Sequence, residues 1–174
     1  MTMTTYQIEI EKKIAQWRKG ELSIEMLRKL PVTIGRVGYQ QAIPVLFELT
    51  LNGDEIVRYN AVMSLSFNLR WKAAKDLLCK VLEEDTDEDC RDAAAGGLGF
   101  LFEGNKDCGL IRVLARVSSA DQDEDVRRSA FAALLRVSSR FQERDFPPRT
   151  GPRPPVDESA LAEVLNECRE DGPH

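Results

Sequence analysis

DEIVRYNA at residues 54–61 recurs twice, as DEDCRDAA at residues 87–94 and as DEDVRRSA at residues 123–130. Each copy runs from acidic residues through a small apolar residue and an arginine to an alanine, and a leucine follows at the same offset, at Leu65, Leu98 and Leu134. Successive copies begin 33 and 36 residues apart. A fixed period in this range is typical of stacked supersecondary units rather than of one closed globule. The chain is therefore predicted to be a repeat protein.

The residues around each copy predict a pair of α-helices. Apolar residues at helical spacing precede each copy, and a polar turn ends that first helix. The aspartate that follows suits an N-cap, because it accepts backbone N–H groups at the positive end of the helix dipole. In the second helix the small residue, the alanine and the leucine share one face, which only a neighbouring pair can bury. The repeats are predicted at about residues 39–70, 72–104 and 107–140.

Two more helices are predicted ahead of the repeats. Residues 6–19 carry one apolar stripe and end at Gly20, and a second helix over residues 24–30 begins after Ser23 and stops at Pro31. Residues 32–38 contain two glycines and are predicted to be a connection. The predicted α-helical domain thus spans residues 1–140, with its N-terminal helices within residues 6–30.

The composition changes after Arg140. Residues 141–156 are predicted to form a proline-rich linker, because proline cannot continue a helix or a central strand. Residues 157–170 then predict an amphipathic helix with an apolar stripe at Leu161, Val164, Leu165 and Cys168. We expect this helix to cap the last repeat; the alternative is a tethered peptide for a partner.

Residues 42–49 (AIPVLFEL) followed by residues 54–65 (DEIVRYNAVMSL) resemble the HEAT repeat. That family has a proline-containing first helix, an acidic turn, and Val-Arg and Ala in the second helix. The resemblance covers about residues 40–140 and is nearest to short bacterial HEAT proteins, including those similar to phycobilin lyases. It implies an all-α fold, a right-handed α-solenoid of about three helix pairs with the second helices on the concave face. It also implies a structural ladder between repeats, made by Asp54, Arg58, Asp87, Arg91, Asp123 and Arg127.

Composition limits the partners. The net charge is −5 and the sequence pI is near 5.1, which argues against a general nucleic-acid binder, since phosphate contacts need clustered Lys and Arg. No stretch approaches a membrane span, and the first six residues do not resemble a signal peptide. The four cysteines form no C-x-x-C pair and are expected to be buried free thiols, so we predict a cytoplasmic protein without metal or cofactor.

The most unusual run is AAAGGLGF at residues 93–100, because three glycines in one helix each cost roughly 1 kcal/mol relative to alanine. A helical wheel turns Gly97 toward the packed side and Gly96 and Gly99 toward the concave side. A leucine at Gly96 or Gly99 is accordingly expected to preserve stability. The partner-binding residues predicted on this face are Tyr59, Met63, Phe67, Asp92, Gly96, Gly99, Phe100, Arg128, Leu135 and Arg136. The alternative is that Gly97 allows close helix packing and the other two glycines are tolerated.

No catalytic motif accompanies these residues, and the only histidine is the terminal His174. We therefore predict a non-enzymatic module that binds another protein through its concave face, for example a bacterial adaptor or a toxin-neutralising immunity protein. One alternative is a bilin-lyase-like protein that cradles a tetrapyrrole, which absorbance would reveal. A second is a nucleic-acid repair module, which salt-dependent DNA binding would reveal.

Overall fold

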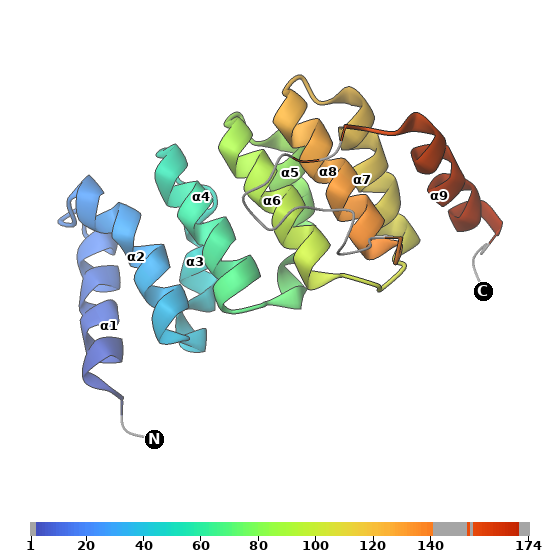
Figure 1. Cartoon of the computed structure of the whole chain (residues 1–174). Helices are drawn as coiled ribbons and strands as arrows, with labels where there is room; N and C mark the ends of the chain where they lie inside the picture. Colours follow the sequence, from blue (N-terminus) through green and yellow to red (C-terminus); the bar gives the residue numbers. More distant parts are fainter. Residues whose placement is uncertain (1–2, 141–152, 154, 171–174) are drawn as a thin grey trace. The chain divides into compact units, whose positions relative to one another are not determined.

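The computed structural model describes residues 3–140, 153 and 155–170, so most of the predicted proline-rich linker lies outside the described residues. All regular elements in these ranges are helices, which confirms the predicted all-α class (Figure 1). None of the helices described is both long and apolar enough to cross a membrane. The chain forms two compact units, residues 1–77 and residues 78–174.

The first unit contains two helix pairs rather than one repeat and a separate N-terminal segment. Its α2 packs against α4 and the π-helix η2 that continues α4, in the way that second helices of neighbouring repeats pack. Its core includes Ile10, Ile34, Leu46 and Leu65, all fully buried. The elements are α1 (Thr5–Arg18), α2 (Ile24–Val37), η1 (Gln40–Ala42), α3 (Ile43–Leu49), α4 (Glu55–Met63), η2 (Ser64–Asn68) and η3 (Lys72–Ala74).

The predicted stop at Pro31 is wrong, because α2 continues through this residue to Val37. A proline inside a helix removes one backbone N–H and disturbs the hydrogen bonds of the preceding turn. Two side chains of the neighbouring helix reach the backbone there: Asn60 Nδ2 donates to the Arg28 carbonyl at 2.9 Å, and Ser64 Oγ donates to the Pro31 carbonyl at 2.9 Å. These contacts hold the turn around Pro31 against α4 and η2, and residues 32–37 are helix rather than a connection.

The second unit is built around α6 and α8, which lie side by side, with α7 packed against α8 (Figure 1). Leu98 of α6 and Leu134 of α8 are fully buried, as the repeat pattern predicted. The elements are α5 (Lys75–Glu84), of which the second unit takes the part from Leu78, and α6 (Glu88–Leu101), α7 (Cys108–Ala120), α8 (Glu124–Val137) and α9 (Glu158–Glu170).

The C-terminal helix α9 docks on α7, as predicted for a capping helix. Leu161 and Val164 are buried, and Arg140 forms ion pairs with Glu163 and Glu167. Cys168 forms a disulfide with Cys108 of α7. The prediction that all four cysteines are free thiols is therefore wrong for this pair, because docking α9 brings two residues 60 positions apart to a Cα–Cα distance of 5.4 Å. The cysteine argument for a reducing compartment loses its support, and the cytoplasmic location stays a prediction.

Candidate interaction surfaces

The aspartates that open the repeat motifs are N-caps. Asp54 accepts from the Val57 N–H at 3.1 Å, and Asp87 and Asp123 accept from the corresponding N–H groups of Cys90 and Val126 at 3.0 Å. Each carboxylate thereby satisfies a donor that the first turn of a helix leaves unpaired. The local sequence alone predicted this role, because a cap acts within three residues.

The motif arginines fix the turns that precede their own helices. Arg58, Arg91 and Arg127 each donate to the carbonyl six residues earlier, at Asn52 (3.0 Å), Asp85 (2.9 Å) and Asp121 (2.7 Å). The same contact at each copy explains the fixed spacing between turn and arginine. These side chains are structural, as the family resemblance implied.

The ladder between neighbouring helix pairs uses a different aspartate from the one predicted. Arg91 makes a bidentate pair with Asp121, Nε to Oδ2 at 2.9 Å and Nη2 to Oδ1 at 3.0 Å, whereas Asp123 is the N-cap. The pair is buried, with 6% and 9% of the two side chains exposed. Burial alone would raise the pKa of Asp121, but the hydrogen bonds from Arg91 and from the Asp123 N–H, with the charge of Arg127, hold it below its ordinary value.

In the first unit the corresponding pair is Arg28 with Asp54, again bidentate, with Nε to Oδ1 at 3.1 Å and Nη2 to Oδ2 at 2.7 Å. Asp54 therefore acts both as N-cap and as ladder residue. The sequence reading missed Arg28 because it ended the helix at Pro31 and did not recognise α2 as the second helix of a pair. The hydrogen bond from Arg28 is the main cause that lowers the pKa of Asp54.

The structure places Gly96 as predicted but not Gly99. Gly96 is exposed, as predicted, but Gly99 is buried against α8. A Cβ at Gly99 would lie 2.8 Å from the Ala133 Cα and 2.9 Å from its Cβ. The helical wheel turned Gly99 toward the concave side, but α8 packs so closely on α6 that it covers this position. Gly99 is therefore a packing residue, and the expectation that a leucine there would preserve stability is wrong.

We expect Gly99→Ala to lower the free energy of unfolding by about 1–3 kcal/mol, because the clash involves backbone that must move. Gly96→Ala, three residues away on the same helix, is the matched control and should be neutral or stabilise by up to roughly 1 kcal/mol. Urea unfolding of the two variants measures both effects. Equal stability of the two would show that α6 and α8 are farther apart than the structure places them.

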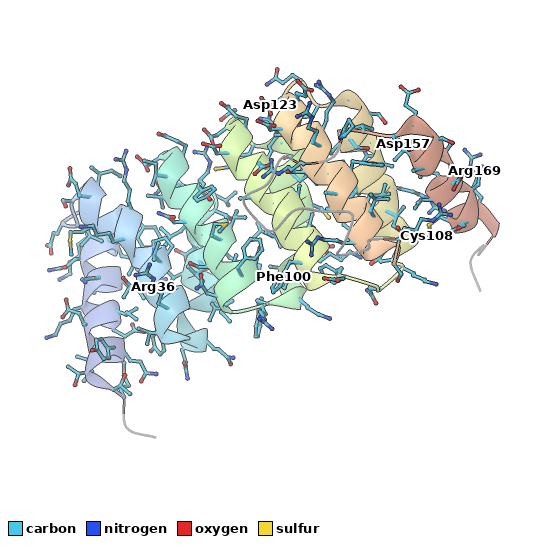
Figure 2. All side chains as sticks on the ribbon, in the orientation of Figure 1. Arg36, Phe100, Cys108, Asp123, Asp157 and Arg169 are labelled. Carbon is cyan, nitrogen blue, oxygen red and sulfur yellow. A yellow bond between two sulfur atoms is a disulfide. The ribbon has the colours of Figure 1, made fainter. Side chains whose placement is uncertain are left out.

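The other predicted residues of the second unit lie along α6 and α8, and we call this group the α6–α8 surface: Asp92, Gly96, Phe100, Arg128, Leu135 and Arg136. All but Gly96 are half-buried. Arg128 pairs with Glu124 at 2.5 Å and Arg136 with Glu103 at 3.4 Å. Asp123 marks the N-terminal end of α8 and Phe100 the opposite end of α6 in Figure 2. The remaining predicted residues, Tyr59, Met63 and Phe67, belong to the first unit, where they are half-buried on α4 and η2.

Asp92 already holds a basic side chain of the same chain. Arg153, beyond α8 and ahead of α9, forms a bidentate pair with it, Nη1 to Oδ1 at 2.5 Å and Nη2 to Oδ2 at 2.6 Å. Ser129 Oγ of α8 donates to the same carboxylate at 2.5 Å, and Arg153 Nη1 also reaches the Asp125 carbonyl at 3.3 Å. Asp92 is thus oriented by α8 and receives an arginine from outside the repeats.

The first unit contains a cavity of about 690 Å³ that the sequence reading did not predict. It is lined by apolar surface and by basic side chains of α2, with one residue each from α1 and α4. Lys29, Val32, Thr33 and Arg36 are spaced three and four apart and so share one face of α2. The predicted helix ended before Pro31 and so did not include Arg36, and for this reason the sequence did not predict that Lys29 and Arg36 share a helix face. The lining residues are Tyr6, Glu25, Arg28, Lys29, Val32, Thr33, Arg36, Val37 and Asn60.

Capped helix pairs, turn-binding arginines and an arginine–aspartate ladder define a helical repeat protein. Residues 23–99 match the family model of HEAT repeats. The match begins at the start of α2, which agrees with α2 acting as the second helix of a pair. No curated protein and no solved structure matches the chain. Within the described ranges no group of three or more His, Cys, Asp or Glu side chains is placed to hold a metal ion.

Proposed function

We propose that this chain is a non-catalytic protein-binding module whose α6–α8 surface receives an arginine from a non-helical segment of another protein. HEAT repeats generally mediate protein–protein interaction, which supports the class of function. Arg153 supports the chemistry, because a side chain from outside the repeats binds Asp92 through both guanidinium nitrogens, as a peptide ligand would. The role we favour is that of an adaptor or of a neutralising partner such as an immunity protein.

The electrostatics around Asp92 favour a cation. Partial burial, together with Asp87, Glu88, Asp92 and Asp123, raises the pKa of Asp89 above its ordinary value. Burial is the largest cause of this raised pKa, and the carboxylates gathered at the N-terminal ends of α6 and α8 supply the rest. A guanidinium that approaches Asp92 is attracted by all of these carboxylates, whereas the neighbouring Arg128 is already paired with Glu124.

A peptide of residues 149–157 (RTGPRPPVD) tests the proposal when it is added to the Arg153→Ala chain. Removing Arg153 vacates Asp92, so the free peptide should shift the backbone amide resonances of α6 and α8 more strongly than in the wild type. Asp92→Asn in the same background should weaken binding about tenfold, because a neutral amide cannot replace the charge-assisted pair. Glu84→Gln, which removes an exposed carboxylate elsewhere in the second unit, should leave binding unchanged.

A peptide with lysine in place of Arg153 should bind more weakly, since an ammonium cannot make the bidentate contact. Equal binding of the peptide to the Asp92→Asn and Glu84→Gln variants would overturn the proposal. A protein partner of the whole chain should follow the same pattern, with tighter binding to Arg153→Ala and weaker binding once Asp92 is also replaced.

A further inference from the structure

The cavity of the first unit holds two basic side chains that the fold does not use. Arg28 is paired with Asp54, but Lys29 and Arg36 form no ion pair among the residues that the structure describes. Both are exposed, and they lie two turns apart on α2. Because Asp54 neutralises Arg28, the remaining charges among the lining residues are the two cations and the single carboxylate of Glu25. The lining therefore has a net positive charge. The cavity is therefore suited to an anionic group.

The cavity lining also includes apolar side chains beside the two cations. Val32 and Val37 of α2 are half-buried in the lining, and Tyr6 of α1 is 72% exposed at its edge. A tyrosine this exposed leaves most of a large aromatic ring without a packing partner, and large aromatic side chains are enriched in protein interfaces. Met3, which is 41% exposed, lies just ahead of Thr4, the N-cap of the same helix.

We propose that this cavity binds a protein segment in which acidic side chains flank a large apolar one. The carboxylates pair with Lys29 and Arg36, and the apolar side chain packs in the same cavity against Val32, Val37 and Tyr6. Nucleic acid fits less well, because its phosphates call for clustered cations, whereas here two unpaired cations lie beside a carboxylate in a chain of net charge −5. This inference rests on the proposed protein-binding function and adds the ligand chemistry of a second surface.

The probe is a synthetic peptide in which glutamates flank a Leu-Phe pair, titrated into the full chain and followed by the backbone amide resonances of α1, α2 and α4. We expect saturable shifts around the cavity. Lys29→Gln combined with Arg36→Gln should weaken binding at least tenfold, and Tyr6→Ala at least threefold. Lys12→Gln combined with Lys19→Gln is the matched control: it removes the same charge from exposed positions of the first unit outside the cavity and should leave binding within twofold of wild type.

Three outcomes would overturn the inference. The double substitution at Lys29 and Arg36 and the control double substitution at Lys12 and Lys19 could weaken peptide binding equally, which would show that binding responds to net charge alone. A peptide with glutamine for each glutamate could bind as well as the acidic one, which would remove the role of the cations. A duplex oligonucleotide or inorganic phosphate could displace the peptide at equal charge concentration, which would mark a general anion site. Because every variant lies in the first unit, the result is separate from that obtained with Asp92 and Arg153.

Discussion

Asp121→Asn is expected to lower the free energy of unfolding by about 3–5 kcal/mol, because it leaves the buried Arg91 guanidinium without its counter-charge. The amide is almost isosteric with the carboxylate, so the loss reflects charge rather than packing. Glu83→Gln, which removes the acidic partner of Arg116 from a much more exposed ion pair, is the control and should change stability by less than about 1 kcal/mol. Urea unfolding at pH 7 measures both.

The same pair predicts a pH dependence. The folded state lowers the pKa of Asp121 below its ordinary value of 3.8, so the folded protein favours the ionised form. Its contribution is fully present at pH values above that ordinary value and is lost as the pH falls through the lower, folded-state pKa. The stability difference between wild type and Asp121→Asn should therefore be constant from pH 7 to 5 and should narrow below about pH 4. A difference that grows on acidification would contradict the assignment of the ladder to Asp121.

Reduction of the Cys108–Cys168 disulfide is expected to have the second large effect. The bond closes a loop of 60 residues, and loop-closure entropy for that length corresponds to about 4 kcal/mol of stability. Helix α9 should remain docked at low denaturant, because Leu161, Val164 and the Arg140 ion pairs still hold it. The expected change is a lower unfolding midpoint with unchanged native circular dichroism.

The chain with Cys108→Ala and Cys168→Ala serves as the control for reduction. Its midpoint should match that of the reduced wild type and should not respond to dithiothreitol. Mass spectrometry after alkylation of the unfolded, unreduced protein should count two modified cysteines, since Cys79 and Cys90 carry thiols. Four modified cysteines in protein purified without any reductant would show that the disulfide does not form.

Local sequence determined the elements whose causes act within a few residues. The aspartate caps act over three residues and the arginine–turn contacts over six, so one copy of the motif with the two residues before it contains all of their atoms. The repeat period likewise predicted which leucines are buried, because a face that recurs at 0, +4 and +8 can be buried only by a neighbouring helix. For the same reason the apolar stripe of residues 157–170 predicted a docked helix.

Tertiary structure decided whatever depends on residues about 30 or more positions apart. The turn around Pro31 is held by Asn60 and Ser64 from the neighbouring helix, and Gly99 is buried because α8 approaches α6 at that point. Three further contacts join distant segments: the Arg91–Asp121 ion pair, the Cys108–Cys168 disulfide and the Arg153–Asp92 ion pair. Helical periodicity states which face of a helix is apolar, but the identity and the distance of the element that covers that face are set only when the chain folds.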